Sequence, residues 1–168
     1  MNFSCLDIRV GRIVDVEIVN DSEKLYRSDI DVGDDEPRQI VSGLRPYYDL
    51  DDMMNRSCIV ACNLPKAKVA GISSFGMILC GVDSNETLVE ILDPPPLSSI
   101  GERVFCNSEE EEKEEAWKPN RIKKKKAWKI LSQDLKLVDG TAMFRDVPIE
   151  PLSGGLCTTS TLMSGYVC

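Results

Sequence analysis

The chain has 168 residues, of which 42% are hydrophobic and 29% are charged, and its formal net charge at pH 7 is −8. These proportions indicate a soluble globular protein of one or two small domains, and no stretch approaches the ~18 uninterrupted apolar residues of a membrane helix. The sequence has seven cysteines but no histidine and no Cys-x-x-Cys pair, which excludes Ser-His and Cys-His triads and the common zinc-site spacings. We therefore expect a cytoplasmic protein that is not an enzyme, has no membrane association and needs neither a metal ion nor another cofactor.

The acidic clusters and the cysteines have ordinary structural interpretations. Asp34–Glu36 and Asp49–Asp52 are typical of solvated turns, because turns favour aspartate. Four cysteines lie inside apolar runs, where a free cysteine commonly behaves as a small buried hydrophobic residue. Neither group points to a catalytic site.

The first predicted element is a long β-strand at residues 6–18. Apolar and polar residues alternate over most of it, which is typical of a half-buried strand. The alternation shifts after Gly11, where Ile13 and Val14 are adjacent, and this indicates a bulge or a sharp coil. Small closed barrels need a long first strand that bends in this way.

Six shorter elements follow before a proline run. The pattern predicts strands at Leu25–Val32, Arg38–Gly43, Ser57–Cys62, Gly76–Val82 and Thr87–Leu92, and a short helix at Asp49–Met54. Pro94–Pro96 ends the last strand because proline has no N–H to donate. About five main strands within ~100 residues fit an OB-fold barrel better than an immunoglobulin sandwich, which needs ~7. We therefore expect a mainly β protein in which residues 1–106 form an OB-fold domain.

The pattern then changes to a smaller α+β region. It predicts one helix near Lys123–Leu135 and strand-like segments at Thr141–Phe144 and Val147–Glu150. Trp128 forms an i, i+3, i+7 series with Leu131 and Leu135, which favours packing of its ring. We expect residues 107–168 to be an extension, too small to fold well alone, that begins with an acidic linker at 107–119 and packs on the barrel.

Charge is unevenly distributed along the chain. Residues 1–106 hold 10 Lys and Arg against 18 Asp and Glu, whereas residues 107–168 hold 10 of each in separate blocks. Residues 109–115 are almost all glutamate, and residues 117–129 contain seven basic side chains and no acidic one. The blocks allow two interpretations. In the first, the acidic block is a solvated linker and the basic block is the solvated start of a helix. In the second, the basic block is a patch that binds phosphates, and the acidic block shields it when no RNA is bound.

Several segments resemble one family in order and spacing. They are Leu6–Val14, Ser22–Tyr26, Asp31–Gly33, Pro37–Leu44 (PRQIVSGL), Cys62–Met77 (CNLPKAKVAGISSFGM), Leu92–Pro96 (LDPPP), Gly101–Phe105 and Ala142–Pro148 (AMFRDVP). The chain thereby resembles the tRNA-binding domain of the endothelial monocyte-activating polypeptide II family, which is similar to domains appended to some methionyl-, lysyl- and tyrosyl-tRNA synthetases. The resemblance implies an OB-fold with a C-terminal extension that binds tRNA by shape and backbone rather than by sequence.

The resemblance also implies which residues line the tRNA groove. Asn63 is expected to make a polar contact, Lys66 and Lys68 to bind phosphates, Ser74 to form a hydrogen bond, and Met77 to contact a base or sugar. For Met77, packing in the core is an equal alternative. The basic run adds further phosphate-binding candidates, which are Arg121, Lys123, Lys124, Lys125 and Lys126.

The groove segment departs from the family pattern at three places. Pro65-Lys66 stands where Lys-Pro is usual, Ala70 where the family has arginine, and Phe75 where it commonly has glutamine. Loss of a phosphate-binding cation weakens RNA binding and its salt dependence. Phe75 either compensates by stacking or covers the core.

The first strand also resembles a heptapeptide linked to cytokine activity in this family. Its residues are Arg9, Val10, Gly11, Arg12, Ile13, Val14 and Asp15. In a barrel strand the two arginines would point outward and the apolar members would be buried. Two alternatives to tRNA delivery therefore stay open: a cytokine-like signalling domain with an extracellular role, and a scaffold subunit of a synthetase complex. The expected partners are tRNA and a synthetase, or a catalytic domain of the same polypeptide. Because the family's extension imitates a dimer contact of bacterial relatives, we expect a monomer.

Overall fold

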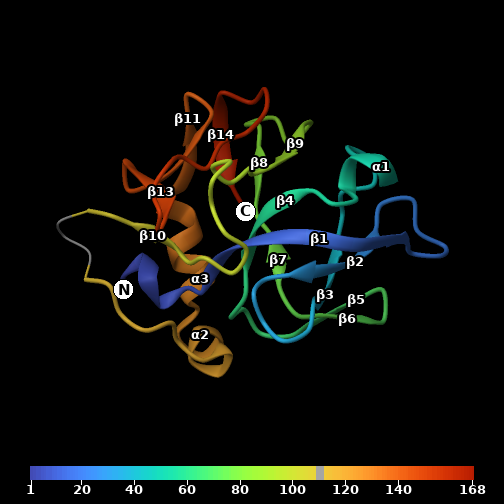
Figure 1. Ribbon diagram of the computed structural model, residues 1–168, viewed down its shortest axis with the longest axis horizontal. Coiled ribbons are helices and arrows are strands. Elements are labelled where there is room, and N and C mark those ends of the chain that lie inside the picture. Colours follow the sequence, from blue (N-terminus) through green and yellow to red (C-terminus); the bar gives the residue numbers. More distant parts are fainter. Residues whose placement is uncertain (109–111) are drawn as a thin grey trace.

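The computed structural model describes residues 1–108 and 112–168 and consists mainly of β-strands. In Figure 1 the strands of the barrel lie on one side, and the C-terminal elements, in orange and red, lie on the other. Five strands form the first sheet, in the order β3-β2-β1-β4-β7. Their bounds are Ile8–Ile18 (β1), Tyr26–Asp31 (β2), Arg38–Ser42 (β3), Ser57–Ala61 (β4) and Met77–Ile78 (β7), and α1 spans Leu50–Met53. The mainly β barrel that the sequence predicts is confirmed.

Strand β1 is long and carries a bulge. It pairs with β4 over its first half and with β2 over its second, and the register shifts between Ile13 and Asp15. The bulge therefore follows Gly11, and it leaves Val14 exposed while Ile13 is fully buried. Gly11 has another role, since a Cβ there would lie 3.1 Å from the Ile30 side chain. Its missing side chain lets β1 pass close to β2.

A break at Leu79 divides the predicted strand Gly76–Val82 between two sheets. Strand β7 pairs with β4, whereas β8 (Cys80–Val82) pairs with β9 (Val89–Ile91). The backbone of Leu79 stays bonded through the break, because it donates to the Ile59 carbonyl and accepts from the Leu92 N–H. The strands on both sides of the break contribute buried apolar side chains to the barrel interior.

Between β4 and β7 the chain forms a hairpin that the sequence pattern did not indicate. Strands β5 (Ala67–Val69) and β6 (Ile72–Ser74) are joined by Ala70 and Gly71, whose φ angles are 50° and 79°. Two positive φ angles are typical of a type I′ turn, which matches the twist of the flanking strands. The hairpin holds Lys68 on the exposed surface, just after the exposed Lys66.

The C-terminal region continues a sheet of the barrel. A seven-stranded sheet runs in the order β10-β13-β12-β11-β14-β8-β9. Its additional strands are Val104–Cys106 (β10), Leu135–Val138 (β11), Thr141–Phe144 (β12), Val147–Pro151 (β13) and Ser164–Val167 (β14). Strand β14 pairs directly with β8 of the barrel. The extension therefore packs on the barrel, as its small size predicts.

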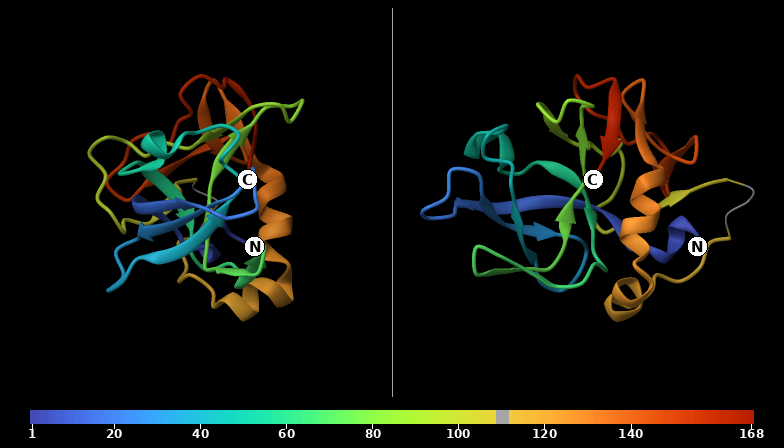
Figure 2. Two further views of the ribbon diagram at one scale, coloured as in Figure 1. Left: turned by 90° about the vertical axis from the view of Figure 1, so that its right-hand side faces the viewer. Right: turned by 180° about the vertical axis from the view of Figure 1, so that it is seen from behind.

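A shared core joins the N-terminal segment to the extension. Phe3, Ile59, Leu131 and Phe144 are all fully buried in one cluster, and the ring centroids of Phe3 and Phe144 are 5.2 Å apart. Figures 1 and 2 show the 3-10 helix η1 (Phe3–Cys5) beside α3 from opposite sides. The boundary expected between residues 106 and 107 therefore does not separate two cores, because residues from both sides of it pack in this one cluster.

Two short helices stand where the sequence predicts one at Lys123–Leu135, so that prediction is wrong in its extent. Helix α2 (Pro119–Lys125) and helix α3 (Ala127–Leu131) meet at Lys126, whose φ of 52° lies in the left-handed region. A 3-10 turn, η2 (Ser132–Asp134), follows, and the next residue already belongs to strand β11. Trp128 packs against the shared core, as predicted. Among the described helices, none has the length and apolar character needed to span a bilayer.

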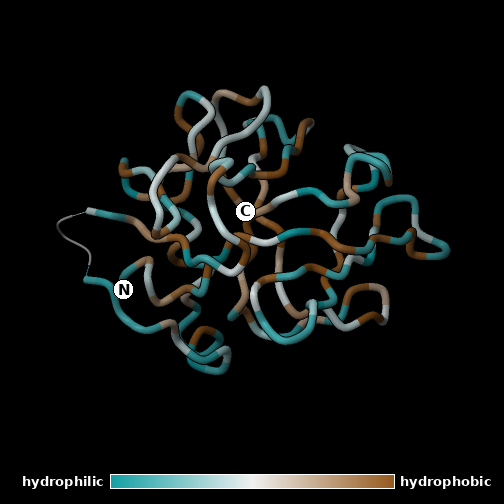
Figure 3. Tube along the Cα trace, in the orientation of Figure 1, coloured by the Kyte–Doolittle hydropathy of each residue, from teal (hydrophilic) through white to brown (hydrophobic). Residues whose placement is uncertain are grey.

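The second half of the predicted acidic linker is bound to the N-terminal segment. Residues 109–111 lie outside the described residues, and Figure 3 shows the segment after them as mainly hydrophilic. The Ser4 hydroxyl donates to the Glu112 carbonyl at 2.9 Å and accepts from the Glu114 N–H at 3.0 Å. The Trp117 N–H donates to the Cys5 carbonyl at 2.9 Å. These bonds bring α2 beside the loop that leads from β4 into β5.

Candidate nucleic-acid interface

A cleft of about 370 Å³ lies between the barrel and helix α2. Lys66 and Phe75, on either side of the β5–β6 hairpin, form part of its barrel wall, and Asn120 and Lys123 of α2 lie on the other wall. Cys62 also lines the cleft, but burial raises the pKa of its thiol to about 12, so the thiol stays neutral and is a poor nucleophile. The cleft therefore offers cations, an amide and an aromatic ring, which suit binding better than covalent chemistry.

Three exposed lysines of the groove motif and helix α2 have no acidic partner among the residues that the structure describes. Lys66, Lys68 and Lys123 are exposed, and none of them forms an ion pair with another described residue. The ammonium of Lys66 lies 5.5 Å from the centroid of the Phe75 ring, within the range of a cation–π contact. The structure thus brings together Lys66 of the groove motif and Lys123 of the basic run, which are far apart in the sequence.

Phe75 faces the cleft and not the core. Its residue is 41% exposed, and its ring belongs to neither hydrophobic cluster. Its backbone is held on both sides, because its N–H donates to the Gln39 carbonyl at 2.9 Å and its carbonyl accepts from Arg38 at 3.2 Å. Of the two sequence-based alternatives, covering the core is therefore wrong, and the ring is available for stacking.

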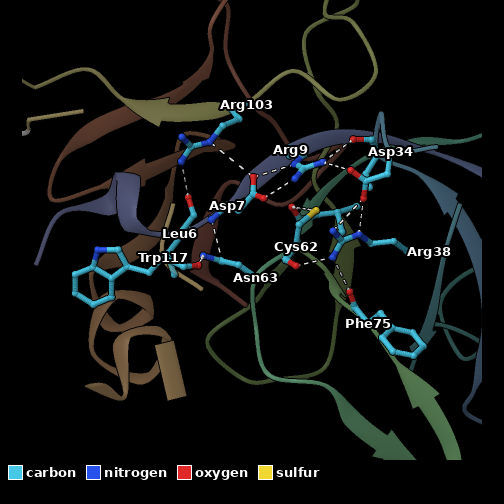
Figure 4. A network of polar contacts seen from close by, with 12 residues as sticks. Leu6, Asp7, Arg9, Asp34, Arg38, Cys62, Asn63, Phe75, Arg103 and Trp117 are labelled. Carbon is cyan, nitrogen blue, oxygen red and sulfur yellow. Dashed lines mark hydrogen bonds and ion pairs between the residues drawn. The ribbon is translucent and has the colours of Figure 1, made fainter. Parts of the chain in front are cut away.

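Arg38 is a bridging residue in the wall of the cleft. Its guanidinium donates to the Cys62 and Phe75 carbonyls and to the Asp34 carboxylate, as Figure 4 shows. Asp34 also accepts from Arg9, and these two arginines lower the pKa of its carboxyl group. Arg38 therefore fixes the strands around the cleft, and the Asp34 carboxylate offsets its charge.

Asn63 and Ser74 are buried, and their side chains form hydrogen bonds with backbone groups of the protein. Asn63 is 6% exposed; its amide donates to the Cys5 and Trp117 carbonyls at 2.9 and 2.8 Å and accepts from the Asp7 N–H at 2.9 Å. Ser74 is 5% exposed; its hydroxyl accepts from the Val41 N–H and donates to the Gly76 carbonyl. This placement favours a role in holding the fold over the tRNA contact that the resemblance implies.

The remaining candidates from the groove motif and the basic run either pack against other side chains or lie on the surface. Met77 is half-buried and packs against the shared core. The guanidinium of Arg121 lies 3.8 Å from the centroid of the Trp117 ring, so it helps to dock α2. Lys124, Lys125 and Lys126 are exposed at the end of α2. The last three therefore extend the cationic surface that begins at the cleft.

The cytokine-like segment is mostly occupied by the fold. Arg9 is bound to Asp7 by two hydrogen bonds of 2.9 and 2.6 Å and to Asp34 at 2.8 Å. Val10, Gly11 and Ile13 are buried, as predicted. The exposed members are Arg12, Val14 and Asp15, and the exposure of Val14 contradicts the prediction because the bulge turns it outward. The segment thus presents one arginine and not two.

Sequence reasoning missed Arg38 and Asn120 as residues of the site. Arg38 lies in the PRQIVSGL segment and Asn120 at the start of α2. Neither has a local pattern that marks it. Arg38 reaches the cleft from strand β3, and Asn120 reaches it because α2 docks on the barrel. The seven cysteines are all free, and six of them are buried, among them Cys58, Cys62 and Cys80 of the apolar runs.

Known proteins resemble this chain over most of its length. Residues 8–103 match the family model described as "Putative tRNA binding domain". The chain is 40% identical over 163 residues to the cytoplasmic methionine–tRNA ligase of Arabidopsis thaliana, which covers 96% of this chain and 20% of that protein. It is 36% identical over 168 residues to the aminoacyl tRNA synthase complex-interacting multifunctional protein 1 of Cricetulus griseus, covering 99% of this chain and 45% of that protein. The chain thus spans less than half the length of these relatives.

Solved structures show which part of the fold is shared. The C-terminal domain of Plasmodium vivax p43 aligns with a TM-score of 0.88 at 29% identity and covers 99% of both chains. The CsaA chaperone protein of Picrophilus torridus aligns with a TM-score of 0.53 at 26% identity and covers 60% of this chain. The p43 domain thus shares nearly the whole fold of this chain, whereas the CsaA structure shares about three fifths of it. With a family match over more than half its length, the chain belongs to the tRNA-binding domain family.

Proposed function

We propose that this chain binds tRNA through the cationic surface around the cleft and delivers or retains that tRNA for an aminoacyl-tRNA synthetase. The observation that carries the proposal is a cleft that brings Lys66 and Lys123 together, with Lys68 exposed two residues after Lys66, on a chain whose net charge is −8; none of the three is ion-paired among the described residues. Unpaired lysines concentrated on one surface attract phosphates even when the whole protein is acidic. The contacts are with the backbone and therefore do not depend on sequence.

The chain acts as a binding module and not as an enzyme. Its similarity to a methionine–tRNA ligase and to a synthase complex-interacting protein supports association with a synthetase, either as an appendage or as a scaffold subunit. We place it in the cytoplasm, because the Arabidopsis thaliana ligase that it resembles is cytoplasmic. We expect a monomer, because the extension covers one side of the barrel with a shared sheet and core. Sedimentation equilibrium tests the monomer, and co-purification with a synthetase tests the association.

The salt dependence of tRNA binding tests the interface. Counterion release makes the logarithm of the affinity fall linearly with the logarithm of the salt concentration, by about 0.7–0.9 for each phosphate contact. We expect the triple variant Lys66→Gln/Lys68→Gln/Lys123→Gln to reduce this slope by about 2–3 between roughly 50 and 200 mM salt. The measurement is fluorescence anisotropy with a mixed tRNA preparation.

A matched control removes the same kind of charge elsewhere. Lys24→Gln lies in the β1–β2 connection, which Figure 1 places at the end of the molecule far from α2. Its slope should equal that of the wild type. A triple variant that keeps the wild-type slope and affinity would exclude this surface as the tRNA interface.

A further inference from the structure

We infer that the cleft between the barrel and α2 takes one unpaired nucleotide of the bound RNA, with its base stacked on Phe75 and its flanking phosphates on Lys66 and Lys123. This site rests on the proposed binding of tRNA and adds to it a preference for unpaired over base-paired RNA. The chemical class of ligand is a nucleotide whose base is free to leave its stack.

The size of the cleft fits such a ligand. Its volume of about 370 Å³ lies near the lower end of the range for small-ligand sites, roughly 300–1,000 Å³. One wall comes from the barrel and the other from α2, so a flat group can enter between Phe75 and Asn120. A base inside a duplex is stacked and paired on all sides and cannot reach the ring without being flipped out.

Phe75 has the properties of a stacking platform. Phe75 is 41% exposed, and its backbone is held by Gln39 and Arg38, so stacking costs little ordering of the protein backbone. Every base has a π-face, and stacking on an aromatic side chain therefore tolerates any sequence. The Lys66 ammonium now lies against the ring, and its flexible side chain can turn to a phosphate when a base takes its place.

Because of its polar groups, we expect the cleft to discriminate little among the four bases. Four of the five N–H donors of Arg38 bind Asp34 and two backbone carbonyls, which leaves Arg38 little capacity to read a base edge. Asn120 is exposed and carries both a donor and an acceptor, which suits any of the four bases. The cleft thus selects for an unpaired state and not for a sequence.

The test compares one single-stranded RNA with the same RNA annealed to its complement. The strand carries a central 2-aminopurine, whose fluorescence reports stacking, and both forms are titrated with wild type, Phe75→Ala, Phe75→Trp and Tyr47→Ala at fixed salt. Tyr47 is a matched control because it is an exposed aromatic residue that does not line the cleft.

We expect Phe75→Ala to weaken single-strand binding about 5- to 150-fold, the range for one stacked base. Duplex affinity and the salt slope should be unchanged, since no charge is removed, and the change in 2-aminopurine fluorescence should disappear. Phe75→Trp should restore both the affinity and the fluorescence change, and Tyr47→Ala should behave as the wild type.

Two results would overturn different claims. If Phe75→Ala affects neither form of RNA, or both equally, the nucleotide site is excluded while tRNA binding stands. If the folded wild type binds neither form nor tRNA at low salt, the proposed function itself fails. Urea unfolding of each variant confirms that it is folded.

Discussion

The buried Asn63 gives the sharpest distinction between a structural residue and an RNA contact. In Asn63→Ala the Asp7 N–H and the Trp117 carbonyl lose the partners described above, whereas the Cys5 carbonyl keeps a bond from the Trp117 N–H. Each buried group left without a partner costs about 1–3 kcal/mol, so we expect a loss of about 3 kcal/mol in the free energy of unfolding. For a chain of this size that corresponds to a fall in Tm of roughly 6–12 °C.

Urea unfolding followed by fluorescence of Trp117 and Trp128 measures this loss. Asn120→Ala is the matched control, because that asparagine is exposed in the cleft and its removal should change stability by no more than about 0.5 kcal/mol. Below the unfolding transition, Asn63→Ala should lower tRNA affinity less than Lys66→Gln does. Unchanged stability together with a large loss of tRNA affinity would refute the structural role and restore Asn63 as a contact.

Three further outcomes follow from the packing and the charges. Arg9 and Arg38 hold the folded pKa of Asp34 below its ordinary value of 3.8, so their contribution to stability is present above that pH and is lost as pH falls through the folded pKa. Between about pH 5 and pH 2, Arg9→Ala should therefore lose less stability than the wild type. Equal shifts of the urea midpoint in the two proteins across that range would contradict this. Gly165→Ala would place a Cβ against the Val82 carbonyl oxygen and should detach β14, which faster amide exchange in β8 would reveal and unchanged exchange would disprove. A thiol reagent should label only Cys168 rapidly in the native protein and all seven cysteines in urea, whereas rapid native labelling of a second thiol would show that the core opens easily.

The strands of the barrel and their order along the chain could be predicted from the sequence. Alternation of apolar and polar residues along β1 depends only on near neighbours, and so do the apolar runs of β4 and the turn residues around β2 and β3. The resemblance of CNLPKAKVAGISSFGM to a tRNA-binding family also pointed to the side of the barrel on which Lys66 borders the cleft. The family therefore needed no coordinates.

Only the tertiary structure distinguished the buried residues of that motif from the exposed ones. Asn63 and Ser74 have the same polar character as a surface residue, and their burial depends on distant partners such as Trp117 and Val41. Leu135 fits a helical series, yet strand pairing with β12 overrides that local preference. Lys123 and Phe75 become neighbours across one cleft because α2 docks through a core shared with the N-terminal segment, and burial of that common apolar surface is a property of the whole chain that no local pattern records.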